Sequence, residues 1–535
     1  MVTKNRLILP ILLGIALLLF CLAILPNRQA SENLAMVTML QPDEGVVIPV
    51  MQRMISGGAT LKQTLAHFIV YEYYYYGLPF FGLGALLMLA LRGLGLEGNF
   101  ALSMLVLRQT VSVLPTLAGL LVLTYIQDQF KTWRSIAIFL FLAIIPATMR
   151  NAFWLHPDGL VIFFSAMVLY FLWKDNAQLG KHFYWAAAFC GTLTATKLVG
   201  LYFFLAVLLC LALYLSKRQG NWKQAAKAGA LFIGLMLLCF LFSNAFLFSE
   251  YGRIQYLYTL QGQASWLANG YGVVYPKGLA SALPVLEQDY GSAGFVLLAL
   301  ALTLFGIWQQ RSRFNSALIL AWVLPFSISV IFFTHFKYQY WLPVGLPLYS
   351  SFALLLPEKF ESSTLKPGMP VVVRIGLILL VLVQSFMFLR TDETIIKNRF
   401  GALEGNPAMA FYNESMHRLD RLQGTPQNVY FDYRLYLPTK ESWSAATNYD
   451  LLDYAYIHEN KFTILMLSAQ RIADYLSPAA VGVDPQKFIE NQRFYGDAKV
   501  GKLTGYHLLY SDQTALLFIS QEVCLAQFPE ELCSQ

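Results

Sequence analysis

Charge is scarce in this chain: Asp, Glu, Lys and Arg make up 13% of its 535 residues, against about 25% in a soluble globular protein. Several enzyme signatures are also missing. There is no Gly-rich phosphate loop, no metalloprotease helix motif and no nucleophile elbow. The six cysteines show no metal-ligand spacing, and no internal repeat of the transporter kind is evident. These absences argue against a soluble enzyme of any of those classes.

Hydrophobic residues are abundant instead, at 57% of the chain, with a mean hydropathy of +0.52. The apolar runs are too many and too long for signal peptides or core helices. Lipid offers no partners to backbone groups, and the hydrophobicity is continuous rather than alternating, so the spans must be helices. The sequence therefore predicts an all-α polytopic membrane protein. The net charge of +7 comes from basic residues in loops beside spans, which indicates a lipid bilayer as partner and no nucleic acid.

Candidate spans fill the first 390 residues, at about Leu7–Leu25, Leu78–Leu96, Phe100–Ile126, Ser135–Met149, Gly159–Trp173, Phe183–Leu215, Ala228–Phe248, Gly294–Trp308, Asn315–Phe333, Trp341–Leu356 and Val371–Leu389. The run at 183–215 must be two short spans with a turn near Lys197. Two outer loops must be separated by an even number of crossings, so either the run at 78–96 lies in the interface or the run at 100–126 breaks at Pro115. The total number of crossings is therefore odd, 11 or 13.

Orientation follows from the basic residues, which favour the cytoplasmic side. Lys4 and Arg6 predict a cytoplasmic N-terminus. The other basic loops expected inside carry Lys131, Arg134, Lys174, Lys181, Lys217–Lys227, Arg311, Arg313, Lys359 and Lys366. Outside lie a first loop (27–77), the short loop His156–Asp158, a long loop (249–292) and the C-terminal region. The long loop exceeds ordinary connection lengths, which suggests a lid or binding loop.

Residues 391–535 have ordinary polarity and strand-like pieces at Asn428–Tyr433, Phe462–Leu467 and Tyr506–Tyr510. They predict a soluble α/β or α+β domain after the transmembrane domain of residues 1–390. Cys524 and Cys533 are close enough in sequence to form a disulfide if this domain is extracytoplasmic. The sequence alone leaves that pairing open.

Two adjacent carboxylates, Asp43 and Glu44, lie in the first outer loop. Pro42 before them and Gly45 after them predict a turn, followed by a short helix over Val46–Met54. A carboxylate here can be a general base toward an acceptor hydroxyl or can hold a metal. The alternative is a solvated loop that is merely acidic.

A second acidic site, Asp158, lies in Trp154–Gly159, where Pro157 ends one helix and Gly159 opens the next. The alternative is that Asp158 only caps the following helix. Lys197 is the one charge within about thirty apolar residues, and such a charge costs roughly 2.5–3.5 kcal/mol unless it is paired or solvated. It is a candidate for binding a phosphate at the membrane edge; the alternative is a snorkelling lysine.

The outer loop around His335, Lys337 and Tyr338 combines a base, a cation and aromatic rings. A lysine on the side that should be poor in lysine is a candidate partner of a lipid phosphate. Weaker candidates for acceptor or sugar contacts are His156, Tyr74 in a tyrosine cluster that is also typical of an interfacial belt, and Arg253 in the long loop.

In this order of motifs the chain resembles the membrane glycosyltransferases of the GT-C superfamily, above all the branch with protein O-mannosyltransferases and the lipid A aminoarabinose transferase. The motifs that carry the resemblance are Pro42-Asp43-Glu44, the Asp158 loop, Thr-Lys-x-x-Gly around Lys197, and Lys337-Tyr338 before a Pro-x-x-x-Pro helix. The resemblance covers the first 390 residues. Related enzymes often have Arg where Lys337 stands here.

The resemblance implies an inverting transfer of one sugar, a hexose or a pentose, from a polyprenyl-phosphate donor to an extracytoplasmic lipid, glycan or protein. It implies Asp43 as the catalytic base, Glu44 in support and Asp158 as the second acidic residue. It also implies that Lys197 and Lys337 bind the donor phosphate with help from His335 and Tyr338. No cofactor is required, although Asp43 and Asp158 would permit a divalent metal ion.

Two other functions remain open on sequence grounds: a transporter or flippase of a lipid-linked sugar, and an envelope polysaccharide polymerase or ligase. A transporter would place its charges at mid-depth in broken, repeated helices. The expected location is a bacterial inner or plasma membrane in preference to the endoplasmic reticulum.

Overall fold

The computed structural model of the chain describes residues 7–217, 220–309, 312–356, 370–401, 405–529 and 533. Lys4, Arg6, Arg311, Lys359 and Lys366 lie outside the described residues. The chain divides into two compact units. The membrane unit comprises residues 1–28, 48–263 and 277–397, and the sheet unit comprises residues 29–47, 264–276 and 398–535. The positions of the two units relative to one another are not determined.

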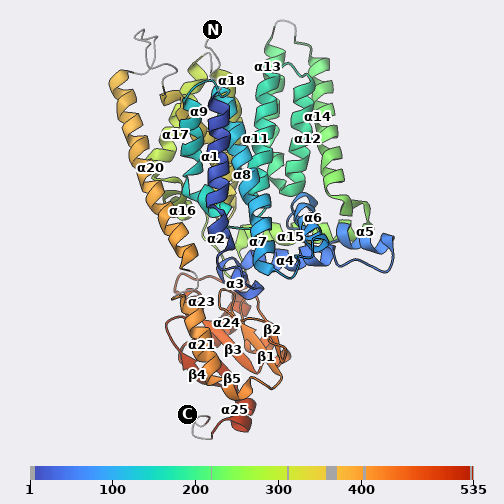
Figure 1. Cartoon of the computed structure of the whole chain (residues 1–535), viewed down its shortest axis with the longest axis vertical. Coiled ribbons are helices and arrows are strands. Elements are labelled where there is room, and N and C mark those ends of the chain that lie inside the picture. The colour runs from blue at the N-terminus through green and yellow to red at the C-terminus, as the bar shows by residue number, and fades with distance from the viewer. Residues whose placement is uncertain are drawn as a thin grey trace. The chain divides into compact units, whose positions relative to one another are not determined.

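All regular elements of the membrane unit are helices, within its described residues (Figure 1). Its elements are α1 (Ile8–Leu22), α2 (Ile24–Arg28), α5 (Leu61–Ile69), α6 (Leu78–Gly93), α7 (Phe100–Leu107), the π-helical η1 (Arg108–Val113), α8 (Leu114–Asp128), α9 (Arg134–Ala143), α10 (Pro146–Ala152), α11 (Asp158–Asp175), α12 (Lys181–Thr196), η2 (Leu198–Phe203), α13 (Phe204–Ser216), α14 (Trp222–Ser243), η3 (Ala245–Phe248), α16 (Leu279–Tyr290), α17 (Ala293–Trp308), α18 (Arg313–Phe333), α19 (Tyr338–Ser350) and η4 (Ser351–Leu355). Three helices have residues in both units: α4 (Pro42–Met54), α15 (Glu250–Asn269) and α20 (Val371–Phe400).

Within the described residues, six helices are long and apolar enough to cross a membrane, or eight if two bent pairs each count as one span. The bent pairs are α9 with α10 and α16 with α17. The six are Ile8–Arg28, Phe100–Asp128, Leu198–Ser216, Trp222–Ser243, Arg313–Phe333 and Val371–Phe400. The fold class predicted from composition, a polytopic helical membrane protein, is confirmed. The number of crossings, 11 to 13, stays a prediction, because shorter helices such as α12 pack among the candidate spans.

Two local predictions about the spans can be compared with the structure. The segment Phe100–Asp128 does not break at Pro115, because that proline lies near the start of α8 and the π-helical η1 leads directly into it. The alternative, a short interfacial helix at 78–96, fits the 16-residue α6 better. The predicted turn near Lys197 is confirmed, since this residue is extended between α12 and η2.

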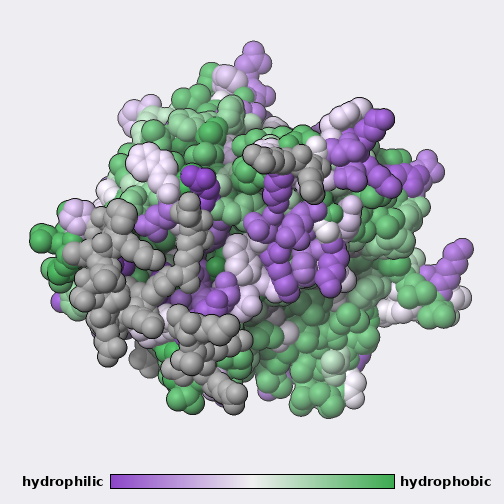
Figure 2. Space-filling view, turned by 90° about the horizontal axis from the view of Figure 1, so that it is seen from above, coloured by the Kyte–Doolittle hydropathy of each residue, from purple (hydrophilic) through white to green (hydrophobic). Residues whose placement is uncertain are grey.

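The basic loops of the membrane unit lie at one end of its helices. Lys217 Nζ donates to the carbonyl of Ala177 at 2.8 Å, so the loop after α13 contacts the loop after α11. Asn315 Nδ2, at the start of α18, donates to Gln127 Oε1 near the end of α8 at 3.0 Å. Figure 2 looks onto the end of the helices at which α1 begins and shows hydrophilic residues among hydrophobic surface. The gathering of these basic loops at one end is what the positive-inside rule predicts for a cytoplasmic face.

The sheet unit holds a five-stranded mixed sheet of order β2-β1-β3-β5-β4, in which β1 is parallel to β2 and β3, and β5 is antiparallel to β3 and β4. Its elements are α3 (Leu34–Leu40), α21 (Pro407–Arg418), η5 (Asp420–Leu422), β1 (Gln427–Phe431), β2 (Trp443–Ala446), α22 (Tyr454–Glu459), β3 (Ile464–Ser468), α23 (Ala469–Tyr475), α24 (Pro485–Lys499), β4 (Tyr506–Ser511), β5 (Ala515–Ser520) and α25 (Gln521–Gln527). The three strands expected from the sequence are confirmed as β1, β3 and β4, and the class is α/β.

Both faces of this sheet are covered, which explains the apolar character of β3. Leu465 and Leu467 pack on one face with residues of α22, α23 and α24, whereas Ile464 and Met466 pack on the other with residues of α21. The alternation follows from the two-residue period of a strand. Cys524 and Cys533 form a disulfide, which was left open on sequence grounds.

The sheet unit also takes in the segment that carries the acidic pair. Asn33 caps α3, and its side chain contacts the hydroxyl of Tyr436 at 3.1 Å. The turn predicted at Pro42–Gly45 is wrong: α4 begins at Pro42, so Asp43 and Glu44 occupy its first helical turn. Proline is well suited to that position, and carboxylates there are favoured by the helix dipole. Gly45 instead allows α4 to approach α3 closely, because a Cβ at this position would collide with the side chain of Thr38 in α3.

Candidate active site

Asp158 is the first residue of α11, and its carboxylate is fully buried. One oxygen accepts a hydrogen bond from Lys197 Nζ at 2.8 Å, and the other lies 2.6 Å from His156 Nδ1. α11 packs against α12, so the first residue of one helix meets the residue that follows the other. The alternative in which Asp158 only caps its helix does not hold, since its oxygens bind these two side chains. This pairing lies at the end of the helices opposite to the basic loops.

The chain before Asp158 is held by the π-helical turn η1. Ser112 Oγ donates to the carbonyl of Trp154 at 2.5 Å. A Cβ at Gly159 would lie 2.6 Å from the carbonyl oxygen of Ser112, so only glycine permits this approach of the two backbones. The Trp154 and His156 rings stack with their centroids 3.9 Å apart. The loop that carries the acid is therefore fixed by packing on both sides.

His156 joins Asp158 to the tyrosine-rich segment. Its Nε2 atom lies 2.8 Å from the hydroxyl of Tyr76, and its Nδ1 atom faces Asp158. If Nδ1 donates to the carboxylate, Nε2 accepts from the tyrosine hydroxyl. A chain of polar contacts thus runs from Tyr76 through His156 and Asp158 to Lys197.

Lys197 lies where the backbone reverses after α12. Gly200 makes this reversal possible: a Cβ there would lie 2.7 Å from the carbonyl of Cys190. The lysine side chain is 15% exposed, and its ammonium lies 5.1 Å from the centroid of the Tyr340 ring. Among the described residues, the ammonium donates to Asp158. An ammonium has three donors, so Lys197 retains capacity to bind an anion.

A second group of residues comes from the start of α19 and from α10. Lys337 Nζ lies 6.0 Å from the centroid of the same Tyr340 ring, so two ammonium groups share one aromatic partner. The Arg150 guanidinium lies 5.9 Å from the Tyr338 ring and forms an ion pair with Asp289 at 2.6 Å. His335 lies half-buried in the connection just before Lys337.

Asp43 and Glu44 belong to the sheet unit, and they differ in exposure. Glu44 is fully buried, whereas Asp43 is half-buried at the start of α4. Of the two, Asp43 is therefore the carboxylate that a substrate can reach. Because the positions of the two units relative to one another are not determined, the convergence of Asp43 with Asp158 stays a prediction.

Two of the weaker candidates lie apart from the Asp158 network. Tyr74 is buried and packs on Phe246, with the ring centroids 4.3 Å apart. Arg253 is exposed and donates to the carbonyl of Leu247 at 3.1 Å. Three contributors were not among the site residues predicted from the sequence: Tyr76 and Tyr340, which lie in tyrosine-rich stretches noted there, and Arg150. For Arg150 a signal existed, since it is a cation four residues before Trp154 on the side expected to be poor in basic residues.

A metal ion does not fit the Asp158 network. Both carboxylate oxygens already face cationic or donor groups, and an ammonium at 2.8 Å would repel a divalent cation. Among the described residues, no group of three or more His, Cys, Asp or Glu is placed to hold a metal. A divalent metal ion shared by Asp43 and Asp158 stays a prediction, because these two carboxylates belong to different units.

The fold and the site define a polytopic membrane protein with a buried carboxylate–lysine pair at one end of its helices and an appended α/β unit. No protein-family model and no curated protein matches the sequence. Among solved structures, ArnT from Cupriavidus metallidurans, in the apo state and bound to undecaprenyl phosphate, is similar at 14% identity over 95% of this chain and 97% of that one, with a TM-score of 0.48. The oligosaccharyltransferase AglB from Archaeoglobus fulgidus is similar at 12% identity over 75% and 62% of the two chains, with a TM-score of 0.45.

Since both TM-scores lie below 0.5, the activity has to be argued from the residues of this chain.

Proposed function

We propose that this chain is an inverting glycosyltransferase that moves one sugar from a polyprenyl-phosphate donor to an acceptor outside the cytoplasm. The observation that carries the proposal is the pair of ammonium groups, Lys197 and Lys337, over the Tyr340 ring at the end of the helices opposite to the basic loops. A lipid phosphate at a membrane edge needs cations at that depth and on that side.

The two ammonium groups at the Tyr340 ring support an anion as ligand. Lys197 also faces the Asp158 carboxylate, which fixes its position beside that ring. Arg150 is already neutralised by Asp289. Asp158 is buried and is better suited to orienting Lys197 than to contacting the sugar, which makes it a positioning residue in this proposal.

The reaction then needs one base. Asp43 takes the proton from an acceptor hydroxyl as its oxygen attacks the anomeric carbon of the donor sugar. The bond from that carbon to the phosphate oxygen breaks, and the electron pair leaves with the polyprenyl phosphate. Lys197 and Lys337, with His335 and Tyr338 nearby, stabilise the negative charge on this leaving group. Attack from the face opposite to the phosphate inverts the anomeric configuration.

Orientation is part of the proposal. The basic end of the membrane unit is cytoplasmic by the positive-inside rule, so the Asp158 network faces the other side of the membrane. The disulfide between Cys524 and Cys533 supports an oxidising compartment for the sheet unit. A bacterial inner membrane, with the sheet unit in the periplasm, satisfies both conditions.

A flippase or transporter of a lipid-linked sugar is the main alternative. Such a protein would carry its charges at mid-depth within broken, repeated helices. In the described membrane unit, Asp158 is the first residue of α11 and Lys197 follows α12, so this pair lies at helix ends, which favours an enzyme over a carrier. A polysaccharide polymerase or ligase would use a long outer loop, but would not need the paired acids of the first loop.

The deciding experiment replaces the proposed base. Asp43→Asn in the purified full-length protein, supplied with polyprenyl-phosphate sugars in liposomes, should slow release of polyprenyl phosphate by about 10²–10⁴-fold, the usual contribution of a general base. The matched control is Asp420→Asn, which changes an exposed carboxylate of the same unit. Equal rates for Asp43→Asn and the wild type would remove the base assignment, and transport without any release of polyprenyl phosphate would favour the flippase.

A further inference from the structure

Four aromatic side chains of the sheet unit form a cluster from three separate chain segments: Trp266, Tyr271, Tyr433 and Tyr449. Trp266 stacks on Tyr271, with ring centroids 5.3 Å apart. Tyr449 lies 5.1 Å from Tyr433 and 6.4 Å from Tyr271. This aromatic cluster therefore joins the long outer loop to two loops at the edge of the sheet.

The rings of the cluster differ in burial from the other tyrosines of the unit. Tyr430 and Tyr495 are fully buried within the core beside the sheet. All four rings of the aromatic cluster are only half-buried. Packing alone would favour complete burial of such large apolar surfaces, since each aromatic ring brings a large area to a core.

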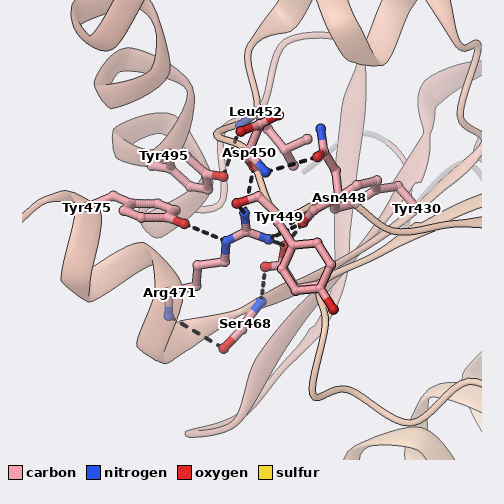
Figure 3. Close-up of polar contacts among 10 residues, drawn as sticks. Tyr430, Asn448, Tyr449, Asp450, Leu452, Ser468, Arg471, Tyr475 and Tyr495 are labelled. Carbon is pink, nitrogen blue, oxygen red and sulfur yellow. Dashed lines mark hydrogen bonds and ion pairs between the residues drawn. The ribbon is translucent and has the colours of Figure 1, made fainter. Parts of the chain in front are cut away.

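A buried arginine holds the loop that carries Tyr449 (Figure 3). Arg471, in α23, donates to the backbone carbonyls of Asn448, Tyr449 and Asp450 at 2.9, 3.0 and 2.6 Å. The same guanidinium lies 4.9 Å from the Tyr433 ring. Three consecutive carbonyls on one planar group leave the loop little freedom, so Arg471 fixes the backbone from which the Tyr449 side chain projects.

The aromatic cluster lies close to the candidate base. Asp43 belongs to the same unit, and its negative charge, after burial, is the second cause that raises the pKa of Tyr449. Tyr271 and Tyr433 are further neighbours that act in the same direction. The half-buried carboxylate and the half-buried rings thus share one region of the unit.

We propose that the aromatic cluster binds a sugar ring of the acceptor and holds one of its hydroxyl groups toward Asp43. A sugar ring has an apolar face of C–H groups that packs on aromatic rings and a rim of hydroxyls that needs a nearby acceptor such as a carboxylate. The inference rests on the proposed function, and it narrows the acceptor to a saccharide-bearing molecule rather than an unglycosylated peptide or lipid.

The test measures binding without turnover. Full-length protein in nanodiscs, with no donor present, is mixed with methyl glycosides of glucose, galactose and N-acetylglucosamine, and saturation-transfer NMR reports which ligand protons contact the protein. A serine-containing tetrapeptide is the non-sugar probe. At least one glycoside should give a saturation effect on its C–H face, and the peptide should give none.

Variants show whether the cluster is responsible. Tyr449→Ala and Tyr433→Ala should each weaken sugar binding about tenfold, the scale of one lost aromatic contact, whereas Tyr449→Phe should retain it. The control is Tyr510→Ala, a tyrosine of β4 whose ring lies 5.2 Å from the Arg418 guanidinium and stacks on Phe411, on the other face of the sheet. It should bind like the wild type.

The proposal fails if no glycoside binds the wild type, if Tyr449→Ala and Tyr433→Ala bind as the wild type does, or if only the peptide binds. Its failure is distinct from that of the proposed function. Should Asp43→Asn leave the release of polyprenyl phosphate unchanged while Tyr449→Ala abolishes sugar binding, the base assignment is wrong and the saccharide subsite stands.

Discussion

Each unit of this protein has a fully buried carboxylate that pairs with a cation, and the two pairs have the same distance. Asp158 faces Lys197 at 2.8 Å in the membrane unit, and Asp432 faces Arg471 at 2.8 Å in the sheet unit. Both carboxylates are 0% exposed. The cations differ, and that difference separates a structural pair from one that is suited to function.

Arg471 uses every donor it has. Its Nε atom donates to the Tyr475 hydroxyl at 2.8 Å, and its two terminal nitrogens donate to three backbone carbonyls (Figure 3). One of these nitrogens also donates to Asp432 at 2.8 Å. The planar guanidinium offers five N–H donors in a fixed fork, and these partners satisfy them within the unit. Nothing remains with which this side chain could bind a ligand.

With the described residues, Lys197 uses only part of its hydrogen-bonding capacity. One hydrogen bond goes to Asp158, and the Tyr340 ring lies beside the ammonium. Its side chain is 15% exposed, against 5% for Arg471. A buried ion pair whose donors are all satisfied stabilises a fold, whereas a lysine with unused donors at a membrane boundary is suited to an anion.

The largest effect on stability is expected at the Asp432–Arg471 pair, in which every donor of the cation has a partner. Arg471→Met should destabilise the sheet unit by about 3–5 kcal/mol, because it leaves the Asp432 charge buried and the loop carbonyls without a donor. Proteolysis of the full-length protein, followed by mass spectrometry of fragments from residues 398–535, measures this. Arg418→Met is the matched control, since Arg418 pairs with Glu414 at the surface, where an ion pair contributes about 0–1 kcal/mol.

Equal protease resistance of Arg471→Met and Arg418→Met would contradict the assignment of Arg471 to the fold. A further check is the double change Asp432→Leu with Arg471→Met. Replacing a buried pair by apolar groups is often far less costly than removing one partner, so the double variant should be more stable than Arg471→Met alone.

At the Asp158–Lys197 pair, the expected effect is on the rate of sugar transfer. Lys197→Met should lower the release of polyprenyl phosphate by about 10²–10³-fold, as is usual when one donor to a developing negative charge is removed. Its cost in stability should be smaller than that of Arg471→Met, because His156 still faces Asp158. Lys197→Arg keeps the charge and should retain more activity than Lys197→Met. If Lys197→Met instead unfolds the membrane unit and Lys197→Arg merely restores the fold, the two pairs are alike and the comparison fails.

The two pairs also show what a sequence can reveal. Lys197 and Asp158 were found because a charge beside long apolar runs is conspicuous, and their energetic cost demands a partner. Arg471 and Asp432 were missed because charges are ordinary in a domain of normal polarity. Their importance depends on burial, which comes from the sheet and α23 packing together.

Other features were not predicted for the same reason, namely that they depend on contacts between separate segments of the chain. Pro42 and Gly45 predicted a turn by local preference, yet Gly45 is needed because α3 approaches α4 there, a contact between segments that local pattern does not contain. Tyr76 and His156 are eighty residues apart, so their contact could not be seen from spacing. The strands β1 and β3 were found, because their apolar runs are bounded by polar residues, whereas the short β2 was not.

The smallest effect is expected from a variant that tests how His156 orients the Asp158–Lys197 pair. Tyr76→Phe removes the hydroxyl that lies 2.8 Å from His156 Nε2 and leaves the ring contacts with Phe80 and Phe81 in place. The loss should be about 0.5–1.5 kcal/mol, the net contribution of one hydrogen bond, and should appear as a fewfold slower release of polyprenyl phosphate. Tyr74→Phe is the control, because Tyr74 packs on Phe246 away from His156. A rate for Tyr76→Phe equal to that of Tyr74→Phe would mean that His156 holds Asp158 without help from Tyr76, and that the polar chain ends at the histidine.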